Sequence, residues 1–177
     1  MKLDVYKCFI PECYLDTALV EVLLNRGNAV THSKGNSSVI AKMNKMLDSF
    51  AVGIIDQDKV VLKDLAQFKI EERLSKQYLK LFKHPKRQHY IIQICPAIEE
   101  WIINQCEKGN IIPSDHGLPN DKKGMVKMKD ITQRNDIRFK KLFKEMSINN
   151  NCDEIQEMLR WLTFFKDHNY QTNLDLL

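Results

Sequence analysis

Three acidic side chains directly follow short apolar runs in the first third of the chain. Glu12 comes after the run CFIP, and Asp56 and Asp58 come after the run AVGII. Carboxylates that are packed close together repel one another and raise each other's pKa values unless a cation lies among them. Hard divalent cations such as Mg²⁺ take oxygen ligands and keep several waters, which substrate phosphates can replace. If the fold brings these acids together, they form a candidate Mg²⁺ or Mn²⁺ site.

The neighbouring sequence predicts the elements that would position these acids. Short apolar runs predict strands at residues 5–10, 29–32, 51–55 and 88–95. Apolar residues at helical spacing, with capping residues, predict helices at residues 16–26, 37–50, 70–82, 97–109, 131–146 and 152–168. We expect Gly27 to cap the first helix in a left-handed conformation, and Ser37 or Ser38 to be the N-cap of the second.

The alternation of strands and helices predicts an α/β fold, with a small parallel sheet and helices on both faces. We expect residues 1–110 to form this core, and residues 111–177 to form a loop and a helical extension packed on the same domain. In such sheets ligands bind where the carboxyl ends of the strands meet, and the first and third strands are commonly neighbours. Glu12 and the pair Asp56 and Asp58 would then share one edge.

The order of these acids resembles that of the Toprim (topoisomerase–primase) family, over roughly residues 4–108. In that family a strand ends in a glutamate, an aspartate often follows four residues later, and a later strand ends in Asp-x-Asp. Glu12, Asp16, Asp56 and Asp58 match this order, whereas Cys13 stands where the family usually has glycine. The resemblance implies that Glu12, Asp56 and Asp58 are metal ligands and that Asp16 is a supporting acid.

A second segment resembles the nuclease-type Toprim proteins related to the overcoming-lysogenisation-defect (OLD) nucleases. The sequence CPAIEEWI places Glu99 and Glu100 at the start of the helix predicted after the fourth strand. The resemblance implies that Glu99, with Glu100 as the alternative, serves a second metal ion in two-metal phosphodiester hydrolysis. It also implies a nucleic-acid substrate, DNA or RNA, and a role in phage defence. The sequence has no P-loop motif, so any ATPase would be a separate partner chain.

Basic residues offer candidate phosphate contacts. Lys34 follows the strand predicted at residues 29–32, near the backbone N–H groups of a predicted helix start, and is a candidate catalytic phosphate ligand. The stretch from residue 122 to 144 is strongly basic and is either a phosphate-binding face or a solvated helix face. Its cations are Lys122, Lys123, Lys127, Lys129, Arg134, Arg138, Lys140, Lys141 and Lys144.

Structural roles for the same acids remain open. Asp16 fits the N-cap of a helix, and Asp56 and Asp58 fit a turn. Glu99 and Glu100 would complement the dipole of the helix that they begin. The sequence IIDQDKVV also resembles the Asp-x-Asp-x-Val signature of haloacid-dehalogenase phosphatases, which would make Asp56 a nucleophile and Asp58 an acid. That signature normally lies in the first strand, whereas here it follows a whole β-α-β-α unit.

A non-catalytic interaction module of Toprim-like fold is the remaining alternative. The helix predicted at residues 152–168 carries Trp161 and Phe165, which are candidates for a homodimer or partner surface. The formal charge of +4 permits nucleic acid as a partner without requiring it. The five cysteines form no CxxC pair, and no apolar run is long enough to be a signal peptide or to span a membrane, so we expect a cytoplasmic protein.

Overall fold

The structure is a computed structural model that describes residues 4–57 and 63–177. These residues form an α/β fold around a five-stranded mixed sheet with the order β1-β2-β5-β4-β3. Strands β1, β2 and β5 run parallel, whereas β4 is antiparallel to β5 and β3 is antiparallel to β4. The strands are β1 (Phe9–Pro11), β2 (Ala51–Asp56), β3 (Lys69–Ile70), β4 (Leu79–Lys83) and β5 (His89–Ile94).

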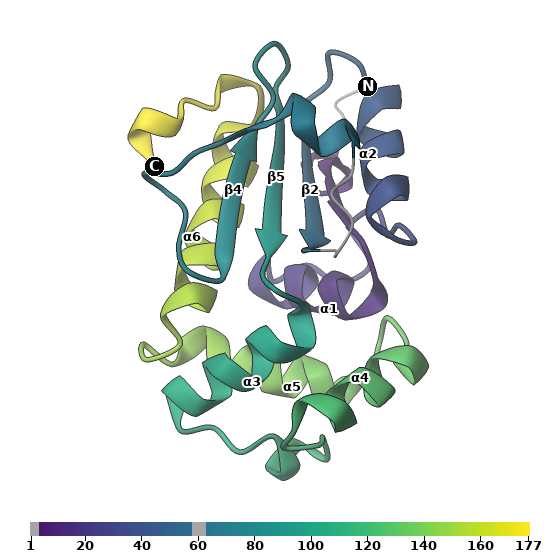
Figure 1. Ribbon diagram of the computed structural model, residues 1–177, viewed down its shortest axis with the longest axis vertical. Coiled ribbons are helices and arrows are strands. Elements are labelled where there is room, and N and C mark those ends of the chain that lie inside the picture. The colour runs from purple at the N-terminus through teal and green to yellow at the C-terminus, as the bar shows by residue number, and fades with distance from the viewer. Residues whose placement is uncertain (1–3, 58–62) are drawn as a thin grey trace.

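Helices cover both faces of this sheet and the edge where its parallel strands end (Figure 1). Helix α2 lies on one face, and α1 and α6 lie on the other. Helices α3, α4 and α5 lie beyond the carboxyl ends of β2 and β5, so they face the edge at which the predicted acids emerge (Figure 1). The helices are α1 (Tyr14–Leu23), α2 (Asn36–Lys45), α3 (Ile98–Gly109), α4 (Lys122–Ile131), α5 (Ile137–Ile148) and α6 (Asp153–His168).

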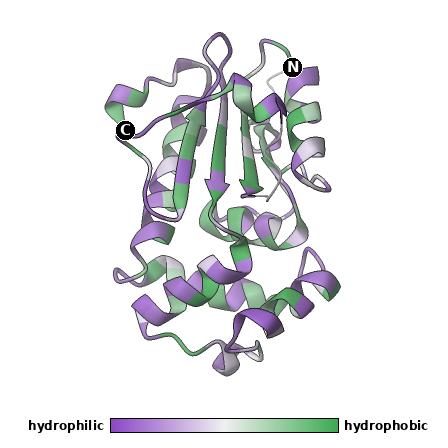
Figure 2. Ribbon diagram, viewed as in Figure 1, coloured by the Kyte–Doolittle hydropathy of each residue, from purple (hydrophilic) through white to green (hydrophobic). Residues whose placement is uncertain are grey.

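The central strands are buried on both faces, because side chains alternate between two hydrophobic clusters. On β2, Val52 and Ile54 belong to the larger cluster, which also includes buried residues of α1, α3, α5 and α6. Ala51 and Ile55 belong to the smaller cluster with Val39 of α2. Strands β2 and β5 are accordingly largely hydrophobic along their length (Figure 2). The larger cluster contains residues from both predicted segments, 1–110 and 111–177. The boundary between these segments at residue 110 stays a prediction.

Several sequence predictions are confirmed. The chain has the expected α/β class with helices on both faces of the sheet, and β1 and β2 are neighbours. The strands predicted at residues 51–55 and 88–95 and the helices predicted at 97–109 and 152–168 lie at those positions.

The five cysteines are free thiols. Among the described residues, no helix is long and apolar enough to cross a membrane.

The helix predicted at residues 70–82 is wrong. This segment holds the end of β3, a turn, and β4, which pairs with β5 over residues 79–83. Leu79 and Leu81 are fully buried while Lys80 between them is not, which is the period of a strand. Leu74, Tyr78, Leu81 and Phe82 also share one face of a helix at their spacing, so pairing with β5 decided the outcome rather than the local pattern.

Other predicted boundaries are also corrected. Residues 5–8 form a 3₁₀ helix ahead of β1, and residues 29–32 are not a strand. Residues 31–33 still run alongside β1. The N–H of Thr31 donates to the carbonyl of Phe9, and the N–H of Ser33 donates to the carbonyl of Pro11. Helix α2 ends at residue 45 rather than 50, and the helix predicted at 131–146 begins only at 137.

The predicted helix caps and the predicted partner surface are wrong as well. Asn25 and Asn28 take the left-handed conformation expected of Gly27, and Gly35 is the N-cap of α2 in place of Ser37 or Ser38. Trp161 and Phe165 are completely buried in the larger cluster. They cannot form a homodimer or partner surface, because they already fill the core between α6 and the sheet.

Candidate acidic site at the carboxyl edge of the sheet

Glu12 and Asp56 meet at the end of the parallel strands. Glu12 directly follows β1, and Asp56 is the last residue of β2. The N–H of Glu12 donates to the carbonyl of Ile54 at 3.0 Å, and the N–H of Asp56 donates to Oε2 of Glu12 at 2.9 Å. The register of β1 and β2 therefore places the two acids side by side, as their order in the sequence predicts.

The carboxylate of Asp56 connects the sheet to two helices. Its Oδ1 accepts a hydrogen bond from the N–H of Ile98 at 3.0 Å, at the first turn of α3. Its Oδ2 lies 2.9 Å from Nζ of Lys129 on α4. The same Nζ lies 2.9 Å from Oε1 of Glu99 on α3. Two carboxylates from separate elements thus converge on one cation.

Both acids of this arrangement are buried. Asp56 is 6% exposed and Glu99 is 4% exposed, so their charges are largely removed from water. Burial raises the pKa of Asp56, and the ion pair with Lys129 offsets part of that rise. Burial also opposes the charged form of Lys129, but Asp56 and Glu99 outweigh it and raise the pKa of the ammonium group. Lys129 is therefore a fixed positive charge held in the acidic edge.

Asp16 is a completely buried acid in the first turn of α1. It forms a capping box with the N-cap residue Cys13, so it is the N3 residue of the helix rather than its N-cap. Its Oδ2 accepts from the N–H of Cys13, and its Oδ1 has no hydrogen-bond partner in residues 4–57 and 63–177. Burial, together with the charges of Asp56 and Glu12, raises the pKa of Asp16 well above its usual value. The environment thus favours the protonated acid.

Cys13 stands where the predicted Toprim resemblance would place a glycine. Its backbone is extended, with φ of −133° and ψ of 176°, so no left-handed turn is needed here. Its Sγ accepts a hydrogen bond from the N–H of Asp16 at 3.4 Å. The departure is therefore compatible with the turn after Glu12.

The other predicted site residues lie in different surroundings. Lys34 is exposed, but the next residue, Gly35, donates its N–H to the carbonyl of Glu12 at 3.2 Å. Lys34 thus lies in a loop that touches the acidic edge. Glu100 pairs with Lys122 on α4 and takes no part in the cluster. Asp58 lies outside the described residues.

Two residues of the site were not predicted from the sequence. Lys129 was only one member of a basic run, and its role depends on α4, which no pattern predicted. The available signal was its spacing of four from Met125, because the buried Met125 turns that face of α4 inward. Asn36 is the second residue, and its Nδ2 donates to the carbonyl of Asp56 at 2.9 Å.

The donor set suits a hard cation, although its present cation is an ammonium group. Carboxylate oxygens are the ligands that Mg²⁺ and Mn²⁺ prefer. Within the described part of the chain, no group of three or more histidine, cysteine, aspartate or glutamate side chains is placed to hold a metal ion. Asp56 and Glu99 supply two convergent carboxylate oxygens. The buried Oδ1 of Asp16 is a further potential ligand oxygen, because it has no hydrogen-bond partner among the described residues.

Comparison with known proteins identifies no relative. No protein-family model, no curated protein and no solved structure matches this chain.

Proposed function

We propose that the chain is a divalent-metal-dependent hydrolase of nucleic-acid phosphodiester bonds. The observation that carries the proposal is the convergence of Asp56 and Glu99 on one cation, beside Glu12, at the carboxyl edge of parallel strands. Ligand sites in α/β sheets lie at this edge. Buried acids that share a positive charge favour a cation site over a set of solvated loop residues.

Asp56, Glu99 and Glu12 would hold Mg²⁺ or Mn²⁺. When bound, such an ion supplies an activated water and stabilises the charge that develops on the leaving oxygen. The fold already orients the protein groups for this task. The N–H of Ile98 holds one oxygen of Asp56, and the N–H of Asp56 holds one oxygen of Glu12. Backbone N–H groups therefore help to position Asp56 and Glu12, whereas the contact of Glu99 is with the side chain of Lys129.

Lys129 has two roles in this proposal. In the metal-free protein it compensates the charges of Asp56 and Glu99. When a metal ion compensates these charges instead, the ammonium group can bind a phosphate oxygen of the substrate, as Lys does in many phosphate sites. Asp16, whose environment favours the protonated form, supports the turn through the N–H of Cys13 and is not required as a ligand.

Cleavage of plasmid DNA and of a structured RNA in Mn²⁺ tests the proposal. We expect the wild type to cleave one of these substrates. Asp56→Ala should reduce the rate by roughly a hundredfold or more, because even residues that only support metal ligands contribute about 10–100-fold. Asp48→Ala is the matched control, since Asp48 is exposed and follows α2 away from the acidic edge. Equal rates for wild type and Asp56→Ala would reject the site.

The phosphatase alternative receives no support from the surroundings of Asp56. A nucleophilic carboxylate needs an oxygen that can approach phosphorus. Both oxygens of Asp56 accept hydrogen bonds, from Ile98 and from Lys129, and the residue is 6% exposed. These contacts fit a carboxylate that is held in place as a ligand.

A further inference from the structure

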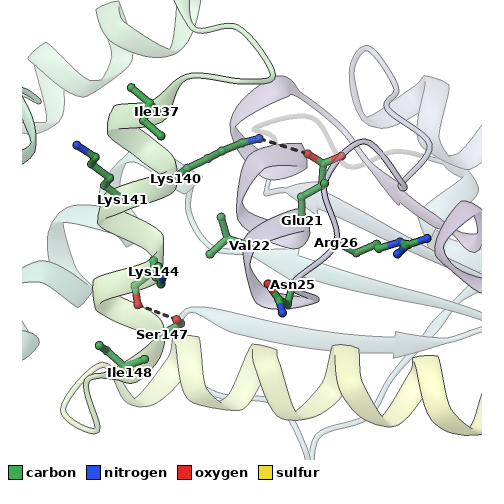
Figure 3. Close-up of a pocket in the computed structure, with 11 residues that line it drawn as sticks. Glu21, Val22, Asn25, Arg26, Ile137, Lys140, Lys141, Lys144, Ser147 and Ile148 are labelled. Carbon is green, nitrogen blue, oxygen red and sulfur yellow. Dashed lines mark hydrogen bonds and ion pairs between the residues drawn. The ribbon is translucent and has the colours of Figure 1, made fainter.

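A basic groove lies between the end of α1 and the length of α5 (Figure 3). Its lining includes none of the acids Glu12, Asp56 and Glu99. Its volume is about 720 Å³. Val22 and Arg26 line it from the α1 side, and Ile137, Lys140, Lys141 and Lys144 line it from α5. Residues 137, 141, 144 and 148 are spaced by four, three and four positions, so one face of α5 carries two isoleucines with two lysines between them.

The groove has an excess of uncompensated positive charge. Within the described residues, the side chains of Lys141 and Lys144 have no hydrogen-bond or ion-pair partner. The single acid of the groove, Glu21, is 3% exposed and is already bound by Arg134 and approached by Lys140 at 3.9 Å. Figure 3 shows Lys140 reaching across the hollow to Glu21. The cations that remain are available for an anionic ligand.

Two further hollows extend the groove. On one side a hollow of about 450 Å³ shares Asn25, Arg26 and Gly27 with the groove and adds both Asp4 and Lys7. On the other side, Nζ of Lys140 donates to Oδ1 of Asn135 at 2.9 Å. Asn135 lines a third hollow, of about 560 Å³, together with Tyr14, His32, Gln133 and Arg134.

Tyr14 links the third hollow to the acidic edge, because it lies two positions after Glu12. Tyr14 is the first residue of α1 and directly follows Cys13, whose N–H binds Asp16. Tyr14 is 40% exposed, and its ring stacks on His32 with ring centroids 4.1 Å apart and an interplanar angle of 10°. An exposed aromatic ring is a surface on which a nucleobase can stack. Helix α1 spans about 15 Å, because its ten residues rise about 1.5 Å each.

We propose that the groove between α1 and α5 binds the phosphate backbone of a nucleic acid and directs the strand past Tyr14 to the acidic edge. This groove would be the substrate-binding surface of the proposed hydrolase. Cleavage of the strand at the acidic edge rests on that proposed function. Binding itself requires no metal ion. Lys141 and Lys144 contact phosphates, and each such contact releases counterions, so affinity decreases as salt rises.

Fluorescence anisotropy with a labelled single-stranded oligonucleotide and with the corresponding duplex, in EDTA and at several salt concentrations, tests this inference. We expect Lys141→Gln with Lys144→Gln to raise the Kd at least tenfold. The slope of log Kd against log salt should fall by about 1.8 for the duplex and about 1.4 for the single strand, at roughly 0.9 and 0.7 per phosphate contact. The matched control is Lys45→Gln with Lys86→Gln, which makes the same charge change at exposed positions outside the groove.

Binding is measured in EDTA, so a wild type that binds the oligonucleotide but cleaves neither DNA nor RNA in Mn²⁺ would reject the proposed function and leave this inference standing. Equal Kd values and slopes for the groove and control variants would overturn it, as would a wild type that binds neither oligonucleotide. Polyglutamate is included as a competitor without phosphates. If polyglutamate displaces the oligonucleotide at equal charge concentration, the groove is a surface for an acidic protein partner and the inference is wrong.

Discussion

At the scale of single residues, the acidic edge depends on one lysine. Burying a charge is costly unless another charge and hydrogen bonds compensate it. Asp56 and Glu99 are both buried, and Lys129 lies 2.9 Å from an oxygen of each. The sequence predicted the acids because of their places after apolar runs. It did not predict Lys129, which is 73 positions from Asp56 and reaches it only through the packing of α4.

Lys129→Met should therefore destabilise the metal-free protein. Methionine keeps the length of the side chain but removes its charge, which leaves two buried acids uncompensated at a cost of about 3–5 kcal/mol. Thermal unfolding in EDTA measures the loss. Added Mn²⁺ should then raise the Tm of Lys129→Met more than that of the wild type, because an ion that binds only the folded state stabilises it.

The matched control for this variant is Lys127→Met, which removes an exposed charge from the same helix. Its Tm should stay close to that of the wild type. An equal loss of Tm in both variants, or a Tm of Lys129→Met that does not respond to Mn²⁺, would contradict the role given to this lysine.

At the scale of elements, the sequence predicted the helices and strands whose own pattern of apolar residues is unambiguous. Strand β2 is a continuous apolar run, and α6 repeats its apolar residues at helical spacing, so both were found. Strand β4 was mistaken for a helix because Leu74, Tyr78, Leu81 and Phe82 fit the helical period, and only pairing with β5 selects the strand. Helix α4 was missed because it buries only Met125 and consists largely of polar residues.

Contact between α2 and β2 occurs where Gly53 leaves room for it. A Cβ atom at Gly53 would lie 2.8 Å from Sδ of Met43 and 2.8 Å from Cγ1 of Val39. Gly53→Ala should therefore lower the free energy of unfolding by about 1–3 kcal/mol, as overpacked cores do. Chemical denaturation measures this value.

Gly27→Ala is the control for the same substitution, because nothing lies within 4 Å of a Cβ atom at Gly27. If crowding is the cause, Gly53→Ala should cost less in a Met43→Ala background than in the wild type, because the shortened side chain leaves room for the added methyl group. A Gly53→Ala variant as stable as the wild type would show that α2 does not pack tightly on this strand.

At the scale of the whole molecule, the parallel strands and the helices beyond them perform separate tasks. The strands bring Glu12 and Asp56 together, which follows from strand order and could be predicted. Helices α3 and α4 close the edge with Glu99 and Lys129, and α5 forms the basic groove with α1. The basic run of the sequence is divided between these tasks: Lys129 turns inward to the acids, whereas Lys141 and Lys144 line the groove. Only the three-dimensional arrangement makes this division.

Calorimetric titration of Mn²⁺ into the metal-free protein tests the central claim most directly. The wild type should bind the ion, and Asp56→Asn, which keeps the size of the side chain but removes its charge, should bind it at least tenfold more weakly, since even supporting residues contribute about 10–100-fold to metal affinity. A wild type that binds no Mn²⁺, or an Asp56→Asn variant that binds it equally well, would contradict the account.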